Sequence, residues 1–177
     1  CRNHSSADTI FQEPWLWGEK TLRIYRKFLK LRYMLLPYYY DLCKKEEEDG
    51  TPMLRPLVFN YEQDEEVKNL NGEFMLGDSL LIAPVVEQGM TNKLVYLPKG
   101  LWYDFWTGEK LEGGQYMICK AALEDCPIFV KGGSIIPMVA PGICLSDQIG
   151  EELYLDTYPD ENGQVKEYLH YQDNGED

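Results

Sequence analysis

Between residues 53 and 141 the sequence consists of short apolar runs separated by turn residues, and this pattern restricts the fold more than any other feature. Glycine, proline and aspartate occupy most of the intervening turns. Strands of this length and spacing predict an antiparallel β-sandwich. The runs are 57–59, 74–76, 80–83, 94–97, 102–103, 128–130 and 134–136. Residues 153–158 and 165–171 further predict a β-hairpin with its turn at 159–163.

Residues 21–40 have a helical pattern instead. Apolar side chains recur there every three or four positions and form one stripe: Leu22, Tyr25, Leu29, Tyr33, Leu36 and Tyr40. Gly18 and Glu19 favour a helix start, because an acidic side chain stabilises the positive end of a helix. Pro37 has no amide hydrogen, so we expect the helix to kink or restart near Met34.

The composition excludes several classes of partner. The 177 residues include 17 basic and 30 acidic side chains, which gives a net charge of −13. That charge repels nucleic acids and anionic membrane surfaces, so we predict neither as a partner. No apolar run approaches the roughly 18 residues of a transmembrane helix. The length corresponds to one domain, or to one domain and a piece of a second.

Cysteine and histidine are too few, and too dispersed, for common metal or disulfide frameworks. Five cysteines occur without any C-x-x-C pair, which favours buried free thiols and a reducing compartment such as the cytoplasm. Only two histidines are present, so a histidine-rich metal site is excluded. Residues 160–163 and 173–175 contain fragments of a calcium-loop pattern, but turns explain both segments better. We predict no metal and no cofactor.

Two sets of residues are candidates for carbohydrate chemistry. Trp102, Tyr103 and Trp106 form either a sugar-stacking platform or part of the sandwich core and its rim, and we favour the core. Glu13, Asp78 and Asp104 are possible acids, but sequence alone does not place two of them at the roughly 5–9 Å that glycoside hydrolysis requires. The residues alone therefore predict a helix followed by a β-sandwich, without a self-contained catalytic set.

Six segments, taken in order, resemble the C-terminal third of glycoside hydrolase family 31, which contains α-glucosidases and α-xylosidases. The first joins Arg2-Asn3-His4-Ser5 to Glu13-Pro14-Trp15. The others are 31–40, 52–57, 74–85, 96–104 and 129–137. We expect the chain to be a piece of a longer polypeptide, since its first residue is Cys1 and the resemblance covers only one part of the family pattern.

The resemblance implies a mostly β architecture in three parts. Residues 1–45 would be the end of a catalytic (β/α)8 barrel, with its last loop and helix. Residues 46–141 would form the proximal C-terminal β-sandwich. Residues 142–177 would begin a distal β domain, in which 171–175 resembles a diverged form of the family's Tyr-Glu-Asp-Asp-Gly sequence.

The resemblance also implies a function. Family members are retaining enzymes whose aspartate nucleophile and acid/base lie on earlier barrel strands, and the family's nucleophile motif is absent from these residues. We therefore expect the C-terminal portion of an α-glucosidase that hydrolyses terminal α-linked glucosyl residues of oligosaccharides. The chain alone should be inactive, and its partner would be the rest of the barrel, in the same polypeptide or a companion chain.

Only one substrate contact carries over from the family pattern. His4 occupies the position of the histidine that hydrogen-bonds sugar hydroxyls in the −1 subsite, and strand ends of this kind bear function in barrels. Arg2 and Glu13 match the same pattern, and we assign them a supporting role in the loop. The alternative is a non-catalytic β-sandwich that supports a barrel or binds glycan through Trp102, Tyr103 and Trp106.

Overall fold

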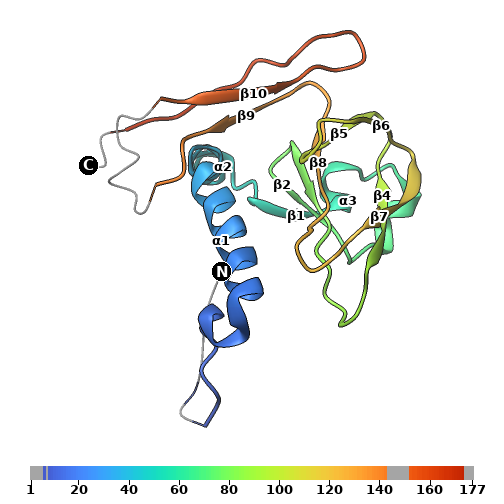
Figure 1. Ribbon diagram of the computed structural model, residues 1–177. Coiled ribbons are helices and arrows are strands. Elements are labelled where there is room, and N and C mark those ends of the chain that lie inside the picture. Colours follow the sequence, from blue (N-terminus) through green and yellow to red (C-terminus); the bar gives the residue numbers. More distant parts are fainter. Residues whose placement is uncertain (1–5, 7, 143–151, 174–177) are drawn as a thin grey trace.

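A computed structural model describes residues 6, 8–142 and 152–173, and in these residues two long helices lie beside a set of antiparallel sheets (Figure 1). The helical elements are η1 (Pro14–Trp17), α1 (Gly18–Met34), α2 (Leu36–Asp49), α3 (Leu57–Asn60) and η2 (Glu65–Asn69). The strands are β1 (Leu54–Pro56), β2 (Phe74–Leu76), β3 (Leu80–Ile82), β4 (Asn92–Leu97), β5 (Leu101–Asp104), β6 (Lys110–Glu112), β7 (Gln115–Lys120), β8 (Ile128–Lys131), β9 (Ser134–Met138) and β10 (Tyr154–Tyr158). The predicted class, an N-terminal helical part followed by antiparallel β-structure, is confirmed.

The predicted helix is interrupted where proline requires it. α1 ends at Met34, and α2 begins at Leu36 with Pro37 in its first turn. A first-turn residue needs no amide hydrogen for the helix ladder, so proline is tolerated there. α2 ends at Asp49 and is capped by Gly50, whose φ of 74° is left-handed and whose amide donates to the carbonyl of Glu46 at 2.9 Å. Both ends therefore follow from local sequence.

The main sheet has apolar residues on both of its faces. Its six strands run in the order β1-β2-β3-β8-β5-β6, and every recorded pair is antiparallel. Because side chains alternate along a strand, Leu80 packs with α2 and β9, whereas its neighbour Leu81 packs with the β4–β7 pair. Ile128 and Phe129 divide in the same way. The sheet thus joins the helices on one face to the β4–β7 layer on the other.

One predicted strand is wrong. Residues 57–59 form α3, a single helical turn that follows the extended Pro56. Leu57 is completely buried, but Phe59 is 53% exposed. A strand would place both of these side chains on the same face, and only one of them has a core to enter. The helical turn separates them.

The predicted hairpin is wrong in its second arm. β10 pairs with β9, from Tyr154 opposite Met138 to Tyr158 opposite Ser134, and residues 165–173 form no strand. The turn itself is present, since the Asp160 amide donates to the Gln164 carbonyl at 2.7 Å. β10 makes its backbone hydrogen bonds with β9, and the residues after the turn are held by the individual hydrogen bonds described below.

The apolar runs did not predict β1, β6 or β7. β1 and β6 carry no apolar run, and β7 has one at 116–119 that was not assigned to a strand, although its side chains are mainly exposed. Among the described cysteines, Cys43 is exposed and Cys119 and Cys126 are partly buried, all as free thiols. The expectation of buried thiols is therefore wrong for Cys43. No helix within the described residues is long and apolar enough to cross a membrane.

Candidate functional site

The two residues of the proposed sugar-binding motif, Arg2 and His4, lie outside the described residues. Glu13, the third residue of that set, precedes η1 and is partly buried. Its Oε2 atom is buried and has no hydrogen-bond partner among the described residues. The supporting role of Glu13 in this loop stays a prediction.

The other two candidate acids have structural partners. Asp78 accepts hydrogen bonds from Arg55 Nη1 at 2.5 Å, from Lys45 Nζ at 2.9 Å and from Asn60 Nδ2 at 2.9 Å. Burial raises the pKa of Asp78, but the Lys45 and Arg55 cations outweigh it and lower the net value. Asp104 accepts from the amides of Trp106 and Thr107 in the turn after β5. These contacts give both aspartates a structural role that requires no part in catalysis.

The three candidate aromatic residues do not form a sugar-stacking platform. Trp102 is completely buried, and its Nε1 donates to the Pro98 carbonyl at 2.7 Å. Tyr103 is 6% exposed and donates to the Pro159 carbonyl at 2.6 Å. Only Trp106 is exposed, and Lys27 Nζ lies 4.3 Å from its ring. The core interpretation is confirmed for Trp102 and Tyr103.

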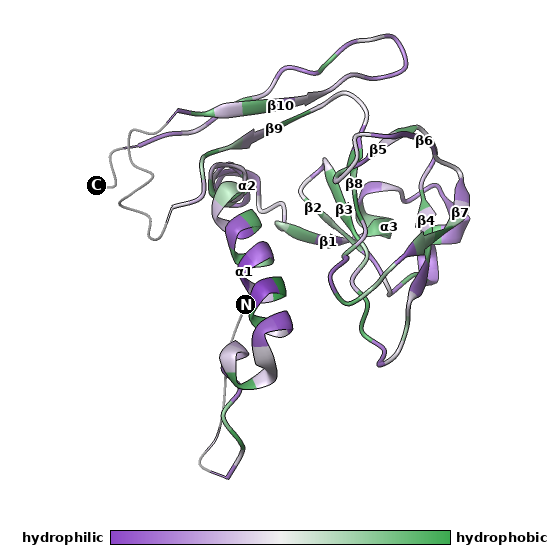
Figure 2. Cartoon of the chain, in the orientation of Figure 1, coloured by the Kyte–Doolittle hydropathy of each residue, from purple (hydrophilic) through white to green (hydrophobic). Residues whose placement is uncertain are grey.

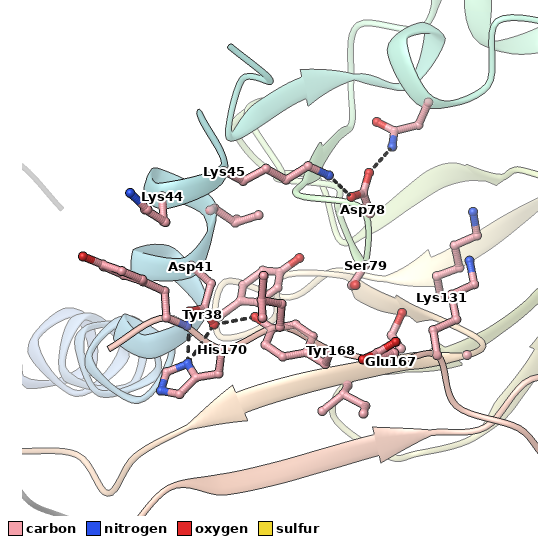
Figure 3. A pocket seen from close by; sticks show the side chains of 18 of the residues that line it. Tyr38, Asp41, Lys44, Lys45, Asp78, Ser79, Lys131, Glu167, Tyr168 and His170 are labelled. Atoms are coloured by element: carbon pink, nitrogen blue, oxygen red, sulfur yellow. Dashed lines mark hydrogen bonds and ion pairs between the residues drawn. The ribbon is translucent and has the colours of Figure 1, made fainter. Parts of the chain in front are cut away.

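A polar cleft of about 640 Å³ lies where distant parts of the chain meet (Figure 3). Its walls are α2, the β2–β3 turn, the β8–β9 turn and residues 166–171. Figure 3 shows Asp41, Tyr168 and His170 directed toward one another at one end, and Asp78 beside Lys45 at the other. The cleft therefore joins the helical part to the sheets and to the C-terminal segment.

Asp41 attaches the C-terminal segment to α2. Its carboxylate, 8% exposed, accepts from the Tyr168 hydroxyl at 2.7 Å and from the Tyr171 amide at 2.8 Å. His170 Nδ1 lies 3.0 Å from Asp41 Oδ1. Burial raises the pKa of Tyr168, and the bond to Asp41 raises it further, so the phenol remains a donor. Sequence reasoning missed this cluster because its members are 127 to 130 positions apart.

A second contact holds α2 against the sheet. The Tyr38 hydroxyl donates to the Leu76 carbonyl at 2.9 Å, and burial raises the pKa of this phenol. Gly77 follows with a φ of 63°, and a Cβ atom at this position would lie 2.4 Å from the Tyr38 oxygen. Glycine is therefore required for both the turn and the close approach of the helix.

The cleft also contains a partly buried cation, Lys131, to which no carboxylate of the described residues is bound. Lys131 Nζ lies 4.8 Å from the centre of the Tyr61 ring. Burial lowers the pKa of Lys131, and the nearby Lys166 lowers it further. Within the described ranges no group of three or more histidine, cysteine, aspartate or glutamate side chains is arranged to hold a metal ion. The cleft joins parts of the fold, and its carboxylates Asp41 and Asp78 are bound by donors of the chain.

Two protein-family models match this chain in consecutive order. Residues 1–42 match the TIM-barrel domain of the glycosyl hydrolases of family 31, and residues 50–136 match the C-terminal domain of the same family. The chain belongs to glycoside hydrolase family 31, and it corresponds to the C-terminal part of that family's enzymes. The matches include both the helical part and the sheets described above.

Known relatives extend over most of the chain. Alpha-glucosidase 2 of Bacillus thermoamyloliquefaciens is 42% identical over 99% of this chain and 22% of its own length. An α-xylosidase of Saccharolobus solfataricus is 38% identical over 90% of this chain and 22% of its own length. A dextranase structure from Flavobacterium johnsoniae, complexed with glucose, has a TM-score of 0.82 at 39% identity, covering 84% of this chain and 18% of the dextranase. The chain thus spans about a fifth of these curated relatives.

Proposed function

We propose that this chain is the C-terminal portion of a retaining α-glucosidase that hydrolyses terminal α-linked glucosyl residues of oligosaccharides. The proposal depends mainly on one observation, the 42% identity to an α-glucosidase along 99% of this chain. A retaining mechanism requires a nucleophile and an acid/base whose carboxyl groups lie about 5 Å apart. We place both on barrel strands that precede this chain.

The contacts of the described carboxylates support that placement. Asp78 is bound by two cations and an amide, and Asp104 caps a turn. Neither is free to attack a sugar or to exchange a proton with it. We infer that the chain alone is inactive.

The surface of the helical part supports the presence of a covering barrel. α1 has no fully buried residue, although Figure 2 shows hydrophobic residues along its length. The segment before it exposes several large apolar side chains: Ile10, Phe11, Trp15, Leu16 and Trp17. We propose the division 1–45 for the barrel end, 46–141 for the proximal sandwich and 142–177 for the start of the distal domain.

Within that barrel we propose that His4 hydrogen-bonds hydroxyls of the sugar in the −1 subsite, and that Arg2 and Glu13 support its loop. A hydrogen bond made more strongly in the transition state is worth about 1–3 kcal/mol. In the longer enzyme His4→Ala should therefore lower kcat/KM about ten- to a hundredfold. An unchanged kcat/KM in a folded variant would remove the assignment.

The activity itself is tested on a polypeptide that contains both the barrel and this chain. We expect hydrolysis of p-nitrophenyl α-glucoside, with the α-anomer of glucose released first, as retention requires. p-Nitrophenyl α-xyloside is the matched comparison, because relatives of both specificities exist. No turnover of either compound would refute the proposal, and so would turnover of the glucoside by the 177-residue chain alone.

A glycan-binding module built on Trp102, Tyr103 and Trp106 is not favoured. Trp102 and Tyr103 are buried, and their polar atoms are already bound within the chain.

A further inference from the structure

A second groove, of about 730 Å³, lies between α3, the loop that follows it, and the end of β4. Figure 1 shows α3 and β4 on the side of the sheets remote from α1. The groove therefore opens on the surface that the helical part leaves free. It is lined by aromatic, acidic and amide side chains from residues 59–65, together with Tyr96, Lys99 and Gly114.

Phe59 provides an exposed aromatic surface in this groove. The ring is 53% exposed, and the guanidinium of Arg55 lies 5.3 Å from its centre. Since Arg55 is only 2% exposed, it lies beneath the ring and leaves the outer face to solvent. An aromatic ring supported from below in this way is a platform on which the apolar face of a sugar ring can stack.

Unpartnered polar groups surround that platform. Glu62, Gln63 and Lys99 are exposed, and none of their side chains has a hydrogen bond or ion pair to another described residue. A carboxylate, an amide and an ammonium group together accept from and donate to sugar hydroxyls. Their neighbours are less free, because Asp64 accepts from the Tyr96 hydroxyl at 2.8 Å.

Two residues that line the groove, Asn60 and Tyr61, have polar atoms with unused hydrogen-bonding capacity. Asn60 donates its amide nitrogen to Asp78 at 2.9 Å, so its Oδ1 atom faces away from that carboxylate. Asn60 Oδ1 and the Tyr61 hydroxyl are both buried, and neither has a partner among the described residues. Buried polar atoms are rarely left unpaired, so these two atoms would complete their hydrogen bonding only if a water molecule entered beside them.

We propose that this groove binds an α-linked glucan chain, with one glucosyl ring stacked on Phe59 and its hydroxyls bound by Glu62, Gln63 and Lys99. The excess of carboxylates in the groove disfavours an anionic ligand, because Glu62, Asp64 and Glu65 would repel a polyanion, whereas an uncharged glucan is not repelled. The inference rests on the proposed function, since the substrate of an α-glucosidase supplies the glucan. It deepens that function by giving the sandwich a role in holding long substrates.

The test is affinity electrophoresis of the barrel-containing enzyme in gels with amylopectin or dextran, at a temperature that keeps hydrolysis negligible. Phe59→Ala should weaken retention in at least one gel about five- to tenfold, the loss expected for one aromatic stacking contact. Tyr154→Ala is the matched control, because Tyr154 is 51% exposed but lies on β10, outside the groove. Gln63→Ala provides a second variant at an exposed position without partners.

Measurements of kcat/KM on a short and on a polymeric substrate distinguish glucan binding in the groove from the hydrolytic activity. p-Nitrophenyl α-glucoside is too short to span a glucan groove, so kcat/KM for it should be unchanged in Phe59→Ala, while kcat/KM for the polymer should fall. If Phe59→Ala and Gln63→Ala are retained like the unmodified enzyme in both gels, the groove proposal is wrong and the activity stands. If retention depends on Phe59 but no α-glycoside is hydrolysed, the proposed function is wrong and the groove stands.

Discussion

Glu73 should make the protein less stable at neutral and alkaline pH than in mild acid. The side chain is 5% exposed, and its two carboxylate oxygens lie 3.1 and 3.3 Å from the Tyr96 amide nitrogen that donates to them. Burial raises the pKa of Glu73 to about 7, although the Tyr96 amide and the Lys93 cation oppose the change. The folded protein therefore favours the protonated form.

The sign and size of the effect follow from the two pKa values. The unfolded chain has the ordinary value of 4.5, against about 7 in the folded chain. Because the folded state binds the proton more tightly, its advantage is complete below pH 4.5, declines as the pH rises through 7, and is absent above that. Relative to its value well below pH 4.5, the unfolding free energy is lower by about 3 kcal/mol at pH 8 and by less than about 1 kcal/mol at pH 5.

Glu73→Gln isolates this term, because the amide oxygen still accepts from Tyr96 but the side chain does not ionise. Urea unfolding of both proteins at pH 5 and pH 8 should show the variant gaining about 2.5 kcal/mol relative to the parent between the two pH values. Glu112→Gln, at an exposed position, is the control and should show no such gain. A stability difference that does not change with pH would refute the reasoning.

Three further predictions concern the contacts of the helical part. Asp41→Ala removes the acceptor of three contacts and should lower the unfolding free energy by about 3 kcal/mol, with faster proteolysis of residues 166–173; a loss no larger than that of the exposed control Glu48→Ala would contradict this. Gly77→Ala should cost more than about 2 kcal/mol in urea unfolding, because the new Cβ meets Tyr38 in a left-handed turn; a neutral result would show that α2 can withdraw. In the isolated chain the amides of α1 should exchange with solvent far faster than those of β3 and β8, since no residue of α1 is fully buried. Strong protection across residues 22–36 in a monomer would remove the support for a barrel placement.

Local periodicity predicted those parts of the fold that depend on neighbouring residues. The helical stripe and Pro37 together predicted α1, the start of α2 and the break between them, but not the continuation of α2 from Asp41 to Asp49. The short apolar runs predicted most strands of the main sheet, because each run places buried side chains on it. The exception was 57–59, where three apolar residues in sequence contribute only one fully buried side chain.

Long-range contacts could not be predicted in the same way. Nothing in residues 154–158 indicates that β9, rather than the segment after the turn, would be their partner. Asp41 resembles any other charged helix residue until Tyr168 and Tyr171 are placed beside it. The role proposed for His4 rests on a family resemblance alone. Phe59 was assigned to a strand, and its exposed face appears only once the helical turn is known.

The polar contacts of α2 have a consequence for the order in which the chain acquires its structure during synthesis. Asp41 and Tyr40 belong to the second helix, but the groups that bind them emerge from the ribosome 127 to 133 residues later. Until then the Asp41 carboxylate, which is nearly buried in the folded protein, must remain hydrated, and this side of the helix stays exposed to solvent. Tyr38, by contrast, finds its partner only 38 residues on. Translation therefore attaches the helix to the sheet early and closes its outer side last, so a chain stalled before residue 168 would expose an incomplete surface to chaperones and proteases.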